Sequence, residues 1–169
     1  MKKPSVRFRG VLEISRNRLW GAHIRVPSAS ARKISEGSSR RVLCRLEDSL
    51  EYQTALMPSG NGSFVIRVNK KLRQRLRLEF GRPVDVVLTP DESRYGLPMP
   101  EELEVLLSQD PQGDRYFRAL TLGRQRTLLH LVGSAKKVET RVKRAVAVVR
   151  HLKTNHGRID FKQLRELMR

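Results

Sequence analysis

Apolar and polar residues alternate through most of the first 90 residues, and a period of two is typical of half-buried strands. The first such segment, residues 6–14, is expected to turn Val6, Phe8, Leu12 and Ile14 inward. Further strands are predicted at residues 19–26, 41–46, 50–56, 64–68 and 84–88. In residues 19–26, one face carries Trp20, Ala22, Ile24 and Val26, and the other carries His23 and Arg25.

Two short helices are predicted between these strands. One begins at Pro27 and stops at Gly37, with proline before the helix and glycine after it. The other covers residues 70–78, with Asn69 as its N-cap and Gly81 as its end.

Residues 58–63 (Pro-Ser-Gly-Asn-Gly-Ser) predict a hairpin connection. A glycine-rich phosphate loop is the alternative interpretation. That loop would need a lysine followed by serine or threonine and then a helix, and neither follows here, so the hairpin is favoured.

The strand and helix pattern repeats at an offset of 42 residues. When residues 22–46 are aligned with residues 64–88, six of the 25 positions are identical. Each copy reads as strand, short helix, strand, and such a unit cannot bury its apolar face alone. We therefore expect the two copies to close around a shared core, with no need for a second chain.

After Pro100 the spacing of apolar residues becomes helical. Helices are predicted at residues 101–108, 114–120, 124–135, 138–153 and 161–168, the last capped by Asp160. In residues 138–153 a stripe is expected to face the core: Val138, Val142, Ala145, Val149 and Leu152. The resulting plan has a first domain at residues 1–92, a linker at 93–99 and a helical domain at 100–169.

Composition narrows the class of protein. No apolar run approaches the roughly 20 residues of a membrane span, and no apolar stretch follows the charged first residues as a secretory signal would require. The single cysteine, Cys44, lies in a predicted strand and is expected to be a small buried residue rather than a nucleophile. We therefore predict a cytoplasmic protein without a membrane partner.

The net charge of +18 is the strongest compositional indication of function, because it attracts polyanions and repels cations. Residues 1–96 have a net charge of +11 and residues 97–169 have +7. The alternative is a solvated basic surface that only maintains solubility.

Several motifs resemble known families. In the first half they are Val26-Pro27, residues 59–62 (Ser-Gly-Asn-Gly), residues 68–71 (Val-Asn-Lys-Lys), and Gly81 before residues 84–88 (Val-Asp-Val-Val-Leu). In this order they resemble a bacterial domain family of unknown function. That resemblance implies a small double-split β-barrel, related to the barrel of transition-state-regulator DNA-binding proteins.

In the second half the motifs are residues 99–103 (Met-Pro-Glu-Glu-Leu), 117–120 (Phe-Arg-Ala-Leu), 125–127 (Gln-Arg-Thr) and 134–144 (Ser-Ala-Lys-Lys-Val-Glu-Thr-Arg-Val-Lys-Arg). They resemble the YdeI/OmpD-associated, or bacteriocin-protection, family. The two resemblances imply an α+β protein with a barrel followed by a helical tail. They carry over no catalytic residue.

Candidate chemistry is sparse. The four histidines do not have the spacing of a metal site, and none lies beside a candidate nucleophile. His151 and His156 flank a predicted helix end, where a cation would favour the helix dipole. We therefore predict a non-enzymatic protein without a cofactor or metal.

The candidate binding residues are cations that could hold phosphates. They project from the outer face of the strands, from the helix after Asn69 and from the tail: Arg7, Arg9, Arg25, Arg41, Arg45, Arg67, Lys70, Arg73, Arg124, Arg126, Lys136, Lys137, Arg141 and Arg144. Arg25 and Arg67 are equivalent in the repeat. Few aromatic residues are expected outside the core, so base stacking is not predicted.

These features predict a monomer that binds nucleic acid through phosphate contacts. The alternative is a stress or bacteriocin-resistance protein that acts through an acidic protein partner. A small-molecule site in the barrel or beside the tail stays open.

Overall fold

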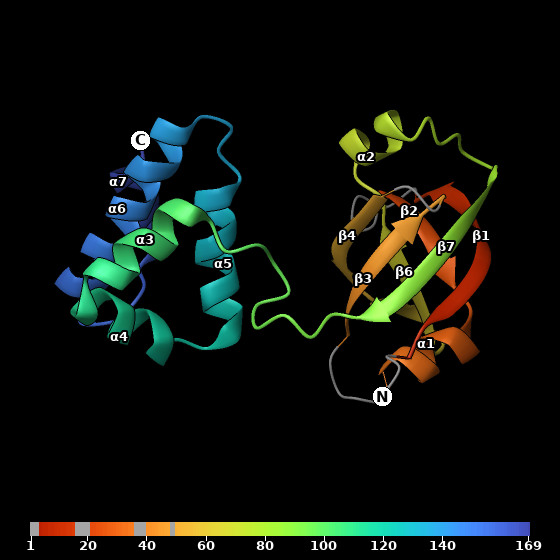
Figure 1. Cartoon of the computed structure of the whole chain (residues 1–169), viewed down its shortest axis with the longest axis horizontal. Coiled ribbons are helices and arrows are strands. Elements are labelled where there is room, and N and C mark those ends of the chain that lie inside the picture. Colours follow the sequence, from red (N-terminus) through yellow and green to blue (C-terminus); the bar gives the residue numbers. More distant parts are fainter. Residues whose placement is uncertain (1–3, 16–20, 36–39, 48–49) are drawn as a thin grey trace. The chain divides into compact units, whose positions relative to one another are not determined.

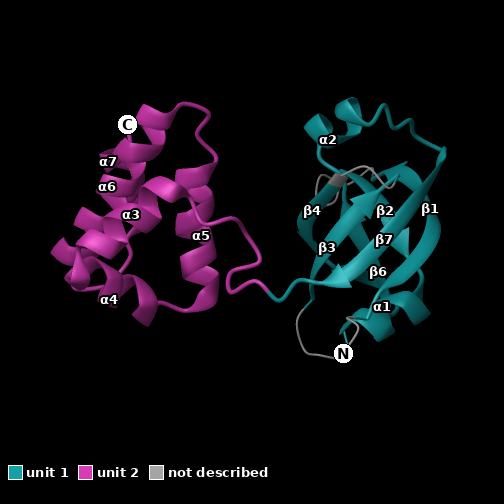
Figure 2. Cartoon of the chain, in the orientation of Figure 1, with its two compact units in different colours: residues 1–92 teal, residues 93–169 magenta. Residues whose placement is uncertain are grey.

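The computed structural model of the chain describes residues 4–15, 21–35, 40–47 and 50–169. The chain forms two compact units, residues 1–92 and residues 93–169, coloured teal and magenta in Figure 2. A curled antiparallel sheet makes up most of the first unit, and the second unit contains helices (Figure 1). The predicted α+β fold is confirmed.

The barrel unit (residues 1–92) combines seven described strands with two short helices. They are β1 (Val6–Ile14), β2 (Ala22–Val26), α1 (Ser28–Ser35), β3 (Arg41–Leu46), β4 (Leu50–Ala55), β5 (Met57–Gly60), β6 (Ser63–Arg67), α2 (Lys70–Arg75) and β7 (Pro83–Pro90). The order of strands in the sheet is β4-β3-β7-β1-β2-β6-β5.

Two strands change partner midway, and this curls the sheet into a barrel. The first part of β1 pairs with β7, and from Leu12 onward β1 pairs with β2. The second such strand is β4 together with β5, which Leu56 joins. Its first part, β4, pairs with β3, and its second part, β5, pairs with β6. The hydroxyl of Tyr52 in β4 also donates to the carbonyl of Arg67 in β6, at 3.0 Å. The strand at one end of the written order, β4, is therefore close to β6, the strand next to the other end.

The register of the sheet confirms the 42-residue repeat and shows that a pseudo-twofold axis relates its two copies. Ile24 of β2 pairs with Ile66 of β6, and these two residues are equivalent in the repeat. Arg45 of β3 pairs with Val87 of β7, which are also equivalent. The axis thus passes through both pairs, and each half supplies part of the other half's sheet.

The structure extends the repeat to a strand pair that the sequence comparison missed. Leu12 and Leu56 are both fully buried where β1 and β4–β5 change partner. Their separation is 44 residues, not 42, so an alignment at a single offset cannot include them. Each half is therefore a β-β-α-β unit.

The barrel core is filled by side chains from both halves. Ile24, Ile66 and Leu88 are fully buried within it. Cys44 is also fully buried, as predicted, and burial raises the pKa of its thiol to about 12. A thiol that stays protonated is a poor nucleophile, so Cys44 acts as a packing residue.

Two details of the first strands differ from the prediction. Ile14 is 65% exposed rather than inward, because it is the last residue of β1 and lies beyond the end of the core. His23 is buried, although its strand neighbour Arg25 is exposed. Trp20, which was predicted to face the core, and Gly37, the predicted helix end, lie outside the described residues.

The hairpin is present but its turn is shorter than predicted. Residues 57–60 are strand, and only Asn61 and Gly62 form the turn, with φ values of 49° and 71°. Two consecutive residues with positive φ are typical of the tight turn that matches the twist of paired strands.

Helix α2 begins where predicted and ends earlier. The side chain of Asn69 accepts a hydrogen bond from the Leu72 amide at 2.8 Å, which confirms it as the N-cap. The helix ends at Arg75, because Arg77 already has a φ of 51°. Leu72 is buried and Leu76 is half-buried, so this side of the helix faces the core.

The helical unit (residues 93–169) has its own core. Its helices are α3 (Glu101–Gln109), α4 (Pro111–Ala119), α5 (Leu122–Gly133), α6 (Val138–Thr154) and α7 (Phe161–Leu167). Leu103, Phe117, Leu129 and Leu164 are buried in this core, with α6 packed against α3, α4, α5 and α7. In the described part of the chain, no helix is both long and apolar enough to cross a membrane.

The buried face of α6 is rotated from the predicted stripe. Ala145, Val149 and Leu152 are buried as expected, but Val138 and Val142 are 54% and 43% exposed. The first two turns of α6 extend beyond the packed core, so a regular apolar spacing there did not produce burial.

Candidate functional site

The predicted strand arginines lie on the outer face of the sheet. Arg7 and Arg45 pair with the same residue, Val87, one from each side. With two strand spacings between them, their backbones are about 10 Å apart. The sheet therefore brings together two arginines that are far apart in the sequence.

Carboxylates on the same face engage two of the other arginines. The Nε atom of Arg25 donates to Glu13 at 2.8 Å, and Arg9 lies 3.9 Å from Asp85. Because these acids lie among the arginines, the outer face is less positive than the arginines alone would make it.

Beneath Arg25, the buried His23 contacts the same carboxylate. Its Nε2 atom is 3.4 Å from the Glu13 carboxylate, and its Nδ1 atom is 3.0 Å from the carbonyl of Gly21. A carbonyl only accepts, so Nδ1 carries the hydrogen. The Glu13 carboxylate thus lies between Arg25, which it binds, and the buried ring of His23.

Arg25 and Arg67, the repeat-equivalent pair, lie on neighbouring strands. Arg25 is opposite Val65 and Arg67 is opposite His23, so they are diagonal neighbours on one face. Such diagonal positions are about 7–8 Å apart. Only Arg25 has the Glu13 contact, because the position equivalent to Glu13 is Met57.

The densest positive charge lies at α2 and around it. The basic strip, as we name it, contains six cations and no acid between residues 67 and 77: Arg67, Lys70, Lys71, Arg73, Arg75 and Arg77. All six except the half-buried Arg73 are exposed. The guanidinium of Arg73 lies over the ring of Phe80, 4.6 Å from its centroid.

Three predicted tail residues bind within the helical unit. Arg126 donates to the carbonyl of Tyr95 at 2.6 Å, and Arg144 donates to the carbonyl of Leu131 at 2.8 Å. Arg141 pairs with Glu102 at 2.7 Å and also donates to the carbonyls of residues 135 and 136. These arginines connect loops and helices. Their guanidinium groups already have partners within the fold, so they are less available to an external phosphate.

The pKa of the Glu102 carboxyl is held below its usual range. A hydrogen bond from its own backbone amide is the main cause, and Arg141 adds to it. Glu102 is therefore ionised at neutral pH, and its ion pair with Arg141 connects α3 to the start of α6. The other tail candidates, Arg124, Lys136 and Lys137, are exposed.

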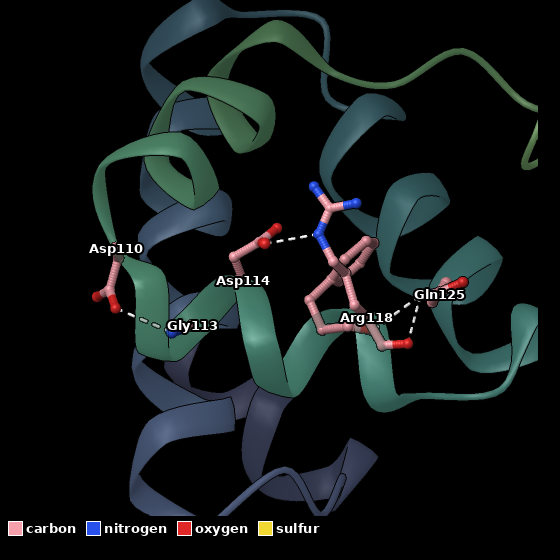
Figure 3. A network of polar contacts seen from close by, with 6 residues as sticks. Asp110, Gly113, Asp114, Arg118 and Gln125 are labelled. Carbon is pink, nitrogen blue, oxygen red and sulfur yellow. Dashed lines mark hydrogen bonds and ion pairs between the residues drawn. The ribbon is translucent and has the colours of Figure 1, made fainter.

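Figure 3 shows a further polar network, on α4. Asp110 accepts from the Gly113 amide at 2.9 Å, and Asp114 accepts from Arg118 at 2.5 Å. Gln125 of α5 donates to the carbonyls of Phe117 and Arg118 at the end of α4. The network fixes the two ends of α4, and Gln125 belongs to the motif at residues 125–127 that carries the family resemblance.

A hollow of about 540 Å³ lies beside this network. Its wall mixes apolar and charged side chains: Tyr95, Met99, Leu107, Phe117, Arg94 and Arg118. Since Asp114 holds Arg118 and the ring of Tyr95 lies under Arg94, these charges already have partners.

His151 differs from its predicted role as a helix-end cation. It is buried, and its Nε2 atom accepts a hydrogen bond from the Asp160 amide at 3.1 Å. Burial lowers the pKa of its imidazole. The ring is therefore neutral and structural. In the described ranges, no group of three histidine, cysteine or carboxylate side chains could hold a metal.

Comparison with protein-family models gives one match for each unit. Residues 8–88 match a domain of unknown function (DUF1905), and residues 97–155 match the family described as bacteriocin-protection, YdeI or OmpD-associated. The predicted resemblance and its order are confirmed. Comparisons with curated proteins and with solved structures returned no match.

Proposed function

We propose that the chain is a cytoplasmic, non-enzymatic protein that binds nucleic acid through phosphate contacts of the basic strip. The observation that carries this proposal is the run of six cations without an acid from Arg67 to Arg77. Exposed lysines and arginines release counterions when they neutralise phosphates, which favours binding without regard to sequence. The scarcity of exposed aromatic residues fits contact with the phosphates rather than with the bases.

The basic strip supports this role better than the outer sheet face does. On the sheet face, Glu13 and Asp85 compete with phosphate for Arg25 and Arg9. In the basic strip no carboxylate interrupts the cations. Arg67 belongs to the strip and lies beside Arg25, so the sheet arginines can extend the contact.

The test is the affinity for a short DNA duplex, measured by fluorescence anisotropy over a series of salt concentrations. We expect log K to fall linearly with log salt, by about 0.9 per phosphate neutralised. A double variant, Lys70→Ser with Lys71→Ala, introduces the residues that α1 has at the equivalent positions, Ser28 and Ala29. It should reduce the slope by about 1.8 if both lysines contact phosphates.

The matched control is Arg32→Gln with Lys33→Gln on α1, which removes the same charge from the other repeat. Its slope should stay near that of the unchanged chain. Equal losses in the two variants would assign the binding to net charge alone, and no binding at low salt would reject the proposal.

The family model at residues 97–155 favours a second candidate, a role in bacteriocin protection or stress through protein partners. Direct capture of cationic peptides is disfavoured by the net charge of +18. Affinity capture before and after nuclease treatment separates the candidates. Partners lost with nuclease support nucleic-acid binding, and a single protein partner that persists supports the second role.

A further inference from the structure

Within residues 93–169, all of which the structure describes, no element covers an apolar stripe on α6. Val138, Val142 and Val146 follow each other at intervals of four residues along α6, and each is 43–54% exposed. Residues four apart lie on the same side of a helix, so the three valines form one line. We name these three residues the valine stripe.

Valine is an unfavourable choice for an exposed helix position. Its branched side chain loses rotamer freedom in a helix, so it forms helices less well than alanine, lysine or glutamate. Three such residues in one line lower the intrinsic stability of α6, while none gains from full burial. Burial by a partner explains both the residue type and the spacing.

The stripe borders a groove between α6 and α3. Val146, Val149 and Leu106 line a hollow of about 350 Å³ that also includes Arg150 and the ion pair between Lys153 and Asp110, at 2.7 Å. At the other end of α3, Glu102 holds Arg141, the residue before Val142. Val105, one turn after Glu102, is 46% exposed. The apolar surface therefore continues from α6 towards α3.

The charges around the stripe are mainly positive. Between residues 136 and 150, the exposed charged residues are Lys136, Lys137, Glu139, Lys143 and Arg150, four cations and one acid. Of the exposed acids of α3, Glu101 lines a hollow with Ser134 and Arg141, and Glu104 lines the hollow with Asp114. An apolar line with cations at both ends is complementary to an acidic, amphipathic segment.

We propose that the valine stripe and its bordering cations form a docking site for an amphipathic helix of an acidic partner protein. Such a helix would place its apolar side chains over the valines and in the hollow, with its carboxylates near Lys137 and Arg150. A second copy of this chain would bring cations against cations. Nucleic acid would leave the valines uncovered. The site does not depend on phosphate binding by the basic strip.

A lipid surface is the remaining class of occupant, and the geometry disfavours it. Helices that lie in a membrane interface present bulky side chains such as leucine, phenylalanine and tryptophan on a convex face. Here the side chains are valines beside a hollow, which suits the insertion of a partner's side chain.

The test uses the full chain and a synthetic helical peptide of ~18 residues, with leucines at helical spacing and glutamates on both flanks. Fluorescence anisotropy should show saturable binding. A peptide with lysine in place of glutamate should not bind. The variant Val142→Ala with Val146→Ala should weaken binding by about tenfold or more. Because alanine is the better helix former, this variant should fold at least as stably.

The control variant Val11→Ala makes the same substitution once, at a valine that is 43% exposed on the barrel unit, and it should bind the peptide normally. Failure of the acidic peptide to bind, or equal binding by both variants, overturns the proposal. So does binding of anionic vesicles that depends on the valine stripe. Dimerisation that the valine substitutions abolish, seen by sedimentation, would assign the stripe to a second copy. If the valine methyls of the free chain are shielded from a soluble paramagnetic probe, the barrel unit of the same chain covers the valine stripe, and the proposal is wrong.

Discussion

Gly10 determines how closely β1 packs over the barrel core. A Cβ atom at this position would lie 2.3 Å from Cγ2 of Ile24, which is fully buried on the pseudo-twofold axis. Ile24 is branched and packed on all sides, so it cannot move away without disturbing its pairing with Ile66.

We therefore predict that Gly10→Ala destabilises the barrel unit by about 1–3 kcal/mol. Denaturant unfolding followed by circular dichroism measures the change. The control is Gly123→Ala in α5, where no atom lies within 4 Å of the added Cβ. That substitution should leave stability unchanged or raise it slightly, because alanine favours a helix. A neutral Gly10→Ala would show that the core can relax around the added carbon.

His151 makes the stability of the helical unit depend on pH. Its folded pKa is lowered by burial, whereas an unfolded histidine titrates near about 6.5. Below that pH the unfolded chain takes up a proton that the folded chain excludes. Stability is therefore complete above the unfolded pKa and declines as the pH falls towards the folded pKa.

We predict that thermal unfolding of the helical unit shifts to lower temperature between about pH 7 and pH 5. His151→Gln should flatten this dependence, since glutamine can still accept the Asp160 hydrogen bond but does not titrate. Asp160 cannot produce the same signal. The amides of Gln163 and Lys162 lower its carboxyl pKa, so its contribution is lost only under more acidic conditions. An unchanged pH profile in His151→Gln would contradict the assignment.

At the scale of elements, local sequence signals predicted the starts of α2, α3, α6 and α7. The predicted starts at residues 114 and 124 were wrong, because α4 begins at Pro111 and α5 at Leu122. Asn69 and Asp160 are N-caps because their side chains accept amide hydrogen bonds one turn ahead. Such a signal depends on a few adjacent residues and needs no tertiary information. The bounds of β3, residues 41–46, were predicted for the same reason.

Burial was predicted less well, because it depends on packing between distant residues. Val142 has the spacing of a core residue and is exposed, whereas His151 was predicted as a helix-end cation and is buried. The same limit applies to the candidate site. Its arginines could be identified from alternation along the strands, but the Glu13–Arg25 and Glu102–Arg141 pairs join residues that no sequence spacing connects.

The cap of α2 allows a direct test of the element that carries the basic strip. Asn69→Ala removes the acceptor of the Leu72 amide and should cost about 1 kcal/mol, with fraying of the helix. Asn69→Ser should retain most of that stability, because serine also caps helices. Hydrogen exchange at the amides of residues 72–75 measures the effect. Equal protection in both variants would show that packing of Leu72 alone maintains the helix.

At the scale of the whole molecule, the two units have separate cores. The barrel core contains both halves of the repeat, and the pairs Ile24–Ile66 and Arg45–Val87 lie within one chain. We predict that residues 1–92, expressed alone, form a monomer that unfolds cooperatively. Sedimentation and calorimetry measure this. A dimeric or unfolded fragment would show that the internal repeat is not sufficient.

Because the repeat is internal, α1 and α2 can acquire different substitutions. In a homodimeric barrel every substitution appears twice, so both ends must carry the same charge. Within one chain the ends can differ, and they do: α1 has two cations, Arg32 and Lys33, whereas α2 has four within six residues. Because these helices lie at opposite ends of the barrel (Figure 1), their unequal charge gives the barrel unit an electric dipole moment. A polyanion nearby would exert a torque on this dipole that turns the α2 end towards it, so the barrel unit would approach a polyanion in one orientation.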